Sequence, residues 1–189
     1  MTKLKGKVRF KTRKKARVKN GIKVAEYQKK LLSLIRKFND PILSKKCDEV
    51  KKEEDVSEIV DNLSKVLKTT KDGVGIAASQ IGSLKRIVAL RFDIKNKDVK
   101  IMISPVISEH TNKTGMGKES CLSYPGIEAI VTRYKEIVVT YLDINLKEQK
   151  QRFEDFKARV VQHEIDHLDG ICKVGDEYDR IKQEEISKK

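Results

Sequence analysis

The chain has 189 residues, 38% of them hydrophobic, and a formal net charge of +14. That length suits one domain with a sizeable core, and the apolar content is low for a globular protein without being that of a disordered chain. We find no apolar run of about 18 residues and no signal-peptide hydrophobic region, so we expect neither a membrane protein nor a secreted one. The three cysteines are widely spaced, unlike a disulfide framework, which favours a reducing, intracellular compartment.

The positive charge is concentrated at the N-terminus. Residues 1–25 hold eleven of the 42 Lys and Arg residues and none of the 28 acidic residues, which leaves a formal charge of +3 on the rest. We therefore predict a basic, flexible arm at 1–25, followed by a single domain at 26–189. Three interpretations of the arm stay open: contact with RNA or a ribosome surface, a solubilising tail, and an organellar transit peptide.

The first apolar pattern runs from Tyr27 to Phe38 and ends at a turn signal, Asn39-Asp40-Pro41. We expect residues 42–50 to form an extended cover segment. From Val56 to Leu67 the apolar residues recur with a 3.6-residue period, which predicts a helix of about three turns. Asp55 precedes that pattern and is expected to cap the helix.

The middle of the chain predicts strands. They are expected at 87–90, 99–103, 137–142 and 151–153. Ser104-Pro105 is expected to close the second strand, and residues 115–126 are expected to be a loop. Because the strands lie between two helical patterns, we predict an α+β fold with largely antiparallel β-sheets packed around a central helix. The chain beyond residue 170 is short and charged, so any final helix should be brief.

The central helix is predicted from Phe156 to Asp169 and carries the motif H-E-x-x-H. Positions i and i+4 share one face of a helix, so His163 and His167 can bind one divalent metal while Glu164 handles the proton of a water molecule. A chance arrangement of solvated polar residues is the alternative. The apolar flanks argue against it, because two imidazoles on an apolar face need partners, and a metal provides them.

Such a metal site needs a third ligand, and a cysteine thiolate suits zinc or ferrous iron. Cys121 lies in a segment of small and polar residues, whereas Cys47 sits in a charged stretch and Cys172 just past the helix. Two alternatives stay open for Cys121, a buried structural thiol and a nucleophile paired with a histidine. Metal ligation accounts for both histidines of the motif, whereas a nucleophile accounts for only one.

Three segments together resemble the peptide deformylase family: 73–80 (GVGIAASQ), 119–123 (ESCLS) and 162–170 (QHEIDHLDG). Each segment alone is moderately specific, and the three in this order at family-like separations are highly specific. The resemblance covers roughly residues 36–175 and leaves out the basic arm.

The resemblance implies that Cys121, His163 and His167 are the metal ligands, with a fourth position for water, and that Glu164 is the general acid and base. It implies Fe²⁺ as the native metal, while Zn²⁺, Ni²⁺ and Co²⁺ also suit such a ligand set. The implied reaction removes the formyl group from N-formylmethionine of newly synthesised polypeptides and releases formate.

Further roles follow from the same resemblance. Gln80, through its side chain, and Leu122, through its backbone N–H, are implied to stabilise the oxyanion. The backbone of Val74 and Gly75 is implied to grip the peptide as an added strand. Ser120, also a substrate-binding candidate, stands where the family usually has glycine. We expect it to strain the loop or narrow the groove and so to alter activity.

The expected partners are N-formylmethionyl nascent peptides and, through the arm, the ribosome or its RNA, with no membrane and a monomeric chain. The expected compartment is the cytoplasm, or an organelle if the arm is a transit peptide. Two other functions stay open: a catalytically impaired deformylase-like protein with a ribosome- or RNA-binding arm, and a zincin-type endopeptidase in which Cys121 has no role. We expect Asp166 to hold a neighbouring polar group, and Arg133 and Arg159 to be structural ion-pair partners.

Overall fold

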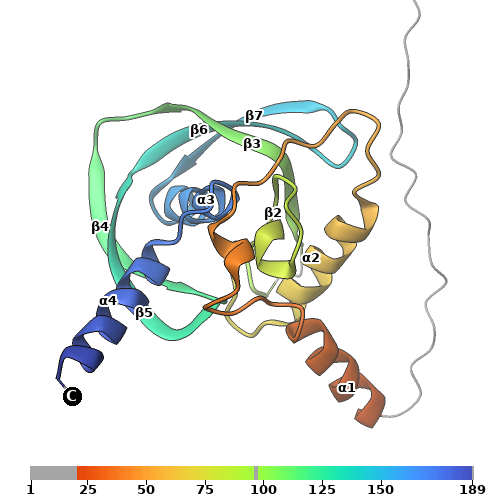
Figure 1. Cartoon of the computed structure of the whole chain (residues 1–189). Helices are drawn as coiled ribbons and strands as arrows, with labels where there is room; N and C mark the ends of the chain where they lie inside the picture. Colours follow the sequence, from red (N-terminus) through yellow and green to blue (C-terminus); the bar gives the residue numbers. More distant parts are fainter. Residues whose placement is uncertain (1–20, 96–97, 189) are drawn as a thin grey trace, which may run out of the picture.

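The computed structural model describes residues 21–95 and 98–188, and Figure 1 shows its elements. The α-helices are α1 (Gly21–Leu32), α2 (Ser57–Thr69), α3 (Asp155–Leu168) and α4 (Lys173–Ser187), with short 3-10 helices η1 (Pro41–Ser44) and η2 (Ala78–Ile81). The strands are β1 (Gly75–Ala77), β2 (Ile87–Leu90), β3 (Lys100–His110), β4 (Thr114–Cys121), β5 (Tyr124–Tyr134), β6 (Glu136–Leu142) and β7 (Glu148–Glu154).

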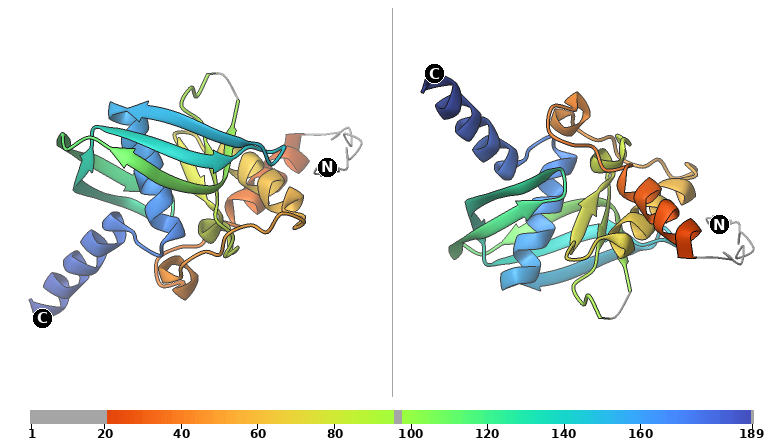
Figure 2. Two further views of the ribbon diagram at one scale, coloured as in Figure 1. Left: turned by 90° about the horizontal axis from the view of Figure 1, so that it is seen from above. Right: turned by 90° about the horizontal axis from the view of Figure 1, so that it is seen from below.

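The strands form two antiparallel sheets. Five of them run in the order β1-β2-β3-β6-β7, and β4 pairs with β5 as a hairpin. Seen nearly along its axis, α3 lies inside the curved wall that these strands make, while α1 and α2 lie at the β1–β2 end (Figure 1). Figure 2 shows α4 extending away from the rest of the chain. The predicted α+β fold with a central helix is confirmed.

Strand β2 contributes side chains to two hydrophobic clusters, one on each face of the five-stranded sheet. Its residues are all buried, and they alternate: Ile87 faces the cluster that includes Leu63 of α2, whereas Val88 faces the cluster that includes Val161 and Leu168 of α3. This follows from the two-residue repeat of a strand, which sends successive side chains to opposite faces. Fully burying each of these aliphatic side chains stabilises the fold by about 1.5–3 kcal/mol. The site-bearing helix α3 is thus anchored by packing on the sheet.

Most of the helix and strand predictions are confirmed. The helix predicted at 56–67 is α2, and the helix predicted at 156–169 is α3. The prediction that Asp55 caps α2 is wrong, because Val56 occupies the cap position. The side chain of Asp55 instead accepts a hydrogen bond of 2.9 Å from the Ser57 N–H two residues on, as in an Asx turn. The strands expected at 87–90, 137–142 and 151–153 correspond to β2, β6 and β7.

The predicted strand end at Ser104-Pro105 is wrong, because β3 continues to His110. The register between β3 and β6 shifts between Ile103 and Val106, and Ser104 has a φ of 48°. An irregularity of this kind lets a proline occur in an inner strand, since the distorted position does not need the missing N–H for the regular ladder.

The predicted loop at 115–126 is also wrong, because it forms β4 and the start of β5. The glycines of this segment are the reason why the sequence indicated a loop. At Gly117 a Cβ would lie 3.0 Å from the guanidinium of Arg159, so glycine leaves room for that side chain beside the strand. Arg159 then donates to the carbonyls of Gly115 at 2.7 Å and Val131 at 2.8 Å, which ties α3 to the hairpin.

The expectation of a brief final helix is wrong as well, since α4 spans 15 residues. Charged residues one turn apart support it: Arg180 pairs with Glu177 at 2.6 Å and with Glu184 on the other side. At the other end of the chain, the predicted arm lies mostly outside the described residues, and residues 21–25 belong to α1. No helix within 21–95 or 98–188 is long and apolar enough to cross a membrane.

The expected extended cover segment at 42–50 begins instead with a 3-10 turn. Asp40 caps η1 by accepting a hydrogen bond of 3.1 Å from the Ile42 N–H, and Pro41 occupies the first turn. The chain is extended only afterwards, where Asp48 forms an isolated bridge with Lys85. This segment covers the end of α3, because the Cys47 N–H donates to the Leu168 carbonyl at 2.7 Å.

Candidate active site

Helix α3 and strand β4 bring the predicted metal ligands into one buried place. Cys121 is the last residue of β4, and its Sγ lies 3.2 Å from His167 Nε2. The rings of His163 and His167 meet edge to face with centroids 4.9 Å apart. Glu164, on the same helix, is also buried. The i, i+4 spacing therefore presents both imidazoles toward the end of the hairpin, as the motif predicts.

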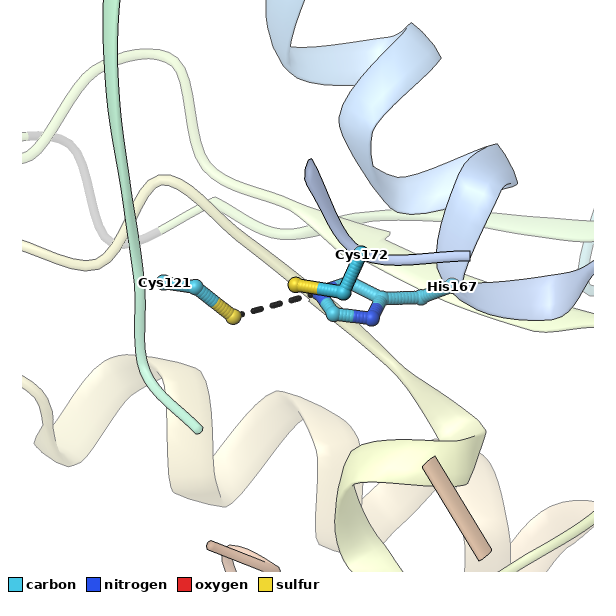
Figure 3. A group of neighbouring side chains, drawn as sticks. All are labelled: Cys121, His167 and Cys172. Atoms are coloured by element: carbon cyan, nitrogen blue, oxygen red, sulfur yellow. Dashed lines mark hydrogen bonds between the residues drawn. The ribbon is translucent and has the colours of Figure 1, made fainter. Parts of the chain in front are cut away.

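Cys172, which sequence reasoning did not select, joins this group. Among the described residues, the ligand atoms of Cys121, His167 and Cys172 all lie within 4.8 Å of one another (Figure 3). Cys172 precedes α4, five positions after His167, and that proximity along the chain was the available signal. His163 is not in this set of three. Its Nδ1 donates to Glu119 Oε2 at 2.9 Å, which makes Nε2 the nitrogen that a metal could use.

The chemistry of these atoms fits a divalent metal ion. Burial holds the pKa of His167 well below its usual range, so its imidazole is neutral, which is the ligating form. The two thiols share a hydrogen bond that raises the pKa of Cys121 and lowers the pKa of Cys172 to about 7. Glu164 Oε2 is buried without a hydrogen-bond partner in the described part of the chain, which marks an incompletely satisfied site. His167 Nδ1 also lacks a partner there, but the nitrogen that meets the thiol of Cys121 is Nε2.

Glu164 has the properties of a residue that exchanges protons near neutral pH. Burial raises its pKa to about 7. Its carboxyl lies against β1: a Cβ on Gly75 would be 2.3 Å from Glu164 Oε1, so only glycine leaves space for the acid there. A group with a pKa near the working pH is suited to both accept and return a proton.

Gln80 is oriented by hydrogen bonds at both ends of its side-chain amide. Its Oε1 accepts from the Ala77 N–H at 2.9 Å, and its Nε2 donates to Ser123 Oγ at 3.1 Å and approaches Cys121 Sγ at 3.4 Å. The buried amide therefore directs its N–H groups toward the sulfur-bearing end of β4. Leu122 follows Cys121 directly, at the turn between β4 and β5.

The segment of residues 36–38, just before η1, braces the two oxyanion candidates. The Arg36 N–H donates to the Gln80 carbonyl at 2.7 Å, and the Phe38 N–H donates to the Ser123 carbonyl at 3.1 Å. Between them, Lys37 Nζ donates to the Leu122 carbonyl at 2.6 Å. The contacts of Lys37 and Phe38 hold the carbonyls of Leu122 and Ser123, in the two peptide groups that follow Leu122. Sequence reasoning missed them because the segment lies more than 80 residues away along the chain.

An ionic cluster lies on the other side of His163. Arg133 pairs with Glu119 through two hydrogen bonds of 3.0 Å and with Asp166 at 2.5 Å, and Arg159 pairs with Glu119 at 2.8 Å. Burial opposes ionisation of Glu119, but hydrogen bonds from His163 and Arg133 outweigh it and lower its pKa to about 2. Likewise, burial lowers the pKa of His163, yet the bond to Glu119 raises it overall. The expected supporting roles of Arg133, Arg159 and Asp166 agree with these contacts.

A cavity of about 770 Å³ opens beside the site. Its lining includes all three substrate-binding candidates, Val74, Gly75 and Ser120, together with the catalytic candidates. Ser120 is exposed, pairs with Glu128 in the hairpin, and is not among the residues of positive φ. The serine therefore needs no left-handed backbone, although the register between β4 and β5 shifts between Ser120 and Cys121.

Strand β1 completes the site as a short strand at the end of the five-stranded sheet. Its Gly75 pairs with Leu90 on one side and lines the cavity, so an extended peptide could be added along the other side. A buried carboxyl with a pKa of about 7, a thiol–imidazole cluster and a cavity with a strand at its rim define a metal-dependent hydrolase acting on a peptide.

Comparison with known proteins assigns the family. The family model "Polypeptide deformylase" matches residues 32–185. The peptide deformylase of Finegoldia magna is 39% identical over 159 residues, which cover 83% of this chain and 96% of that protein. A probable peptide deformylase of Synechococcus phage S-SSM7 superposes with a TM-score of 0.69 and 34% identity, covering 74% of this chain and 96% of the other.

The chain belongs to the peptide deformylase family. It is accordingly an enzyme, a hydrolase that removes the formyl group from N-formylmethionine of newly synthesised polypeptides. A peptide deformylase of Synechococcus elongatus, solved in complex with actinonin, shares 25% identity and a TM-score of 0.69, covering 74% of this chain and 77% of that one.

Proposed function

We propose that deformylation uses Cys121, His163 and His167 as ligands of one divalent metal ion and Glu164 as the proton carrier. The observation that carries this proposal is the 3.2 Å contact between Cys121 Sγ and His167 Nε2 beside a buried carboxyl with a pKa of about 7. Two imidazoles and a thiolate leave a coordination position for a water molecule.

Glu164 performs the proton transfers. When bound, the divalent metal supplies Lewis acidity that makes a water molecule more acidic. Glu164 Oε2, buried without a hydrogen-bond partner among the described residues, takes the proton of the attacking water and passes it to the departing amine. Its placement against Gly75 keeps the carboxyl beside the peptide backbone where that amine forms.

Gln80 and Leu122 stabilise the negative charge that develops on the formyl oxygen. Gln80 Nε2 points toward Cys121, and the Leu122 N–H lies in the peptide group that links Cys121 to Leu122. Both donors are braced before substrate arrives, which avoids a reorganisation cost during the reaction. Removal of one such donor typically lowers the rate by about 10²–10³-fold.

The substrate lies along β1. The backbone of Val74 and Gly75 supplies main-chain hydrogen bonds to the formylated peptide, and Ser120 contacts the peptide from β4 across the cavity. The exposed serine side chain occupies space in the groove that glycine would leave free. It therefore affects which peptides fit, and it does not affect metal binding.

Fe²⁺ is the proposed native metal, with Zn²⁺, Ni²⁺ or Co²⁺ able to occupy the same ligands. The proposed substrates are nascent peptides, met by a monomeric enzyme in the cytoplasm; an organelle is the alternative compartment.

The basic arm at 1–25 is proposed to contact the ribosome or its RNA. Deleting residues 1–20 should leave turnover of a formylated tripeptide unchanged but weaken salt-sensitive ribosome binding, as measured by co-sedimentation; unchanged binding at low salt would exclude this role.

The function is tested by measuring formate release from a formylated tripeptide under anaerobic conditions, with metal analysis of the same sample. Cys121→Ala should lose both metal and formate release, whereas Cys47→Ala, at a buried thiol outside the site, should keep both. Absence of formate release from iron-loaded wild-type protein would instead support the catalytically impaired alternative. The endopeptidase alternative is not favoured, because it gives no role to a thiol in contact with His167.

A further inference from the structure

Cys172 is a thiol at the metal-binding end of α3 that the roles above do not use. Its Sγ lies within 4.8 Å of both Cys121 Sγ and His167 Nε2 (Figure 3). We propose that Cys172 supplies a second thiolate ligand to the divalent metal, opposite the substrate cavity. This inference rests on the proposed metal-dependent function.

The distances are close to those of a metal site. In a tetrahedral zinc site with metal–sulfur bonds of about 2.3 Å and metal–nitrogen bonds of about 2.0 Å, the ligand atoms lie roughly 3.3–3.8 Å apart. Cys121 Sγ and His167 Nε2 are 3.2 Å apart, and no pair in the set exceeds 4.8 Å. Gathering the three atoms around one cation therefore needs movements on the order of 1 Å.

Cys172 does not line the cavity that substrate is proposed to occupy. Cys121, His163 and Glu164 line the cavity, whereas Cys172 is not among its lining residues. With Cys121, His163 and His167 also bound, Cys172 would be a fourth protein ligand, and the water molecule for hydrolysis would then bind as a fifth ligand, a coordination number that catalytic zinc sites reach during reaction.

The start of α4 holds the Cys172 side chain in place. Cys172 Sγ accepts a hydrogen bond of 3.4 Å from the Gly175 N–H at the helix N-terminus, where the helix dipole favours negative charge. Buried Val174 joins the small apolar cluster of Cys121 and β5, which fixes the first turn. Gly175 lies so close to Tyr124 that a Cβ would be 2.8 Å from its ring, which again anchors this turn against the hairpin.

A second thiolate changes which metal the site prefers. Thiolates are soft ligands that favour zinc and are less suited to harder ions. A set containing Cys121, Cys172, His163 and His167 should therefore hold Zn²⁺ more tightly than the same set without Cys172.

The test uses full-length protein reconstituted anaerobically with one equivalent of Co²⁺. The near-ultraviolet thiolate-to-cobalt absorption should fall by about half in Cys172→Ser relative to wild type. Zn²⁺ affinity, measured by competition with a chromophoric chelator, should fall at least tenfold, roughly the smallest effect of altering groups around a metal. Cys47→Ser is the matched control and should change neither value. Equal absorption per bound cobalt in Cys172→Ser and wild type would overturn the proposal.

A second measurement uses only the wild-type protein, so its result does not depend on whether Cys172→Ser folds. Zinc-edge X-ray absorption should find two sulfur atoms at about 2.3 Å from the metal; a single sulfur atom overturns the inference. Formate release separates the two claims. Active enzyme with one sulfur per metal refutes only the Cys172 inference, whereas inactive enzyme with two sulfur atoms refutes only the proposed function.

Discussion

The two sides of His163 differ in how completely their polar atoms are paired. On the ionic side, Glu119 is surrounded by His163, Arg133 and Arg159, and every charge has a partner of opposite sign. On the thiol side, the buried Glu164 Oε2 lacks a hydrogen-bond partner among the described residues.

This difference distinguishes the residues that hold the site in one geometry from the residues that take part in the reaction. A fully paired network holds its members in one geometry, and Glu119 thereby fixes the ring of His163 from behind. Atoms left incompletely paired in a buried place cost stability, so their retention indicates groups that a bound metal, water or substrate satisfies. We therefore expect changes on the ionic side to affect stability and changes on the thiol side to affect turnover.

Glu164→Gln should give the largest effect on turnover. The amide has nearly the same shape but cannot take the proton of water, so we expect formate release to fall by about 10²–10⁴-fold while bound metal is kept. Glu58→Gln, at an exposed acid of α2, is the control and should release formate at the wild-type rate. Wild-type-like turnover by Glu164→Gln would refute the assigned proton-transfer role.

Arg133→Met should lower the free energy of unfolding by disrupting the ion pairs around Glu119. It leaves Glu119 buried with one fewer partner, and removing one member of a buried ion pair costs about 3–5 kcal/mol of unfolding free energy. Arg152→Met is the matched control, because that arginine is exposed and its pairs with Glu136 and Glu154 should contribute about 0–1 kcal/mol. Urea denaturation measures both, and equal losses would contradict the distinction between a buried network and surface pairs.

Gly75→Ala tests the contact between β1 and the thiol side. The added Cβ would lie 2.3 Å from Glu164 Oε1 and must displace the carboxyl, while the backbone φ of Gly75 is not positive and tolerates alanine. We expect kcat/KM to fall by about 10²-fold, a typical cost of a 1 Å misplacement. Gly115→Ala, whose new Cβ would meet only the flexible side chain of Lys135, should leave kcat/KM nearly unchanged.

Lys37→Met should give the smallest effect. It removes one hydrogen bond to the Leu122 carbonyl, worth about 0.5–1.5 kcal/mol, so we expect kcat to fall by about three- to tenfold. The lysine is exposed, so the stability should change little. Lys182→Met on α4 serves as the control, and an identical kcat in both variants would show that segment 36–38 does not brace the oxyanion donors.

Much of the fold could be read from local patterns. The 3.6-residue repeat predicts α2 and α3, and β-branched runs predict β2 and β6, because one face of each element must be buried. Prediction failed where a local signal had a distant cause. Gly117 indicated a loop, yet glycine occurs there to make room for Arg159 of α3, and Ser104-Pro105 indicated a strand end but forms an irregularity in an inner strand.

By itself, the sequence determined the helix with two imidazoles one turn apart, the acid between them, and the three segments that assign the family. Only the tertiary structure decided which sulfur atoms meet those imidazoles, which segment braces Gln80 and Leu122, and which charges surround Glu119. The physical reason is separation along the chain. Periodicity and capping act within a few residues. The contacts of Cys121 with His167, of Lys37 with Leu122 and of Glu119 with His163 instead join residues about 40 to 85 positions apart and form only when the sheets curve around α3.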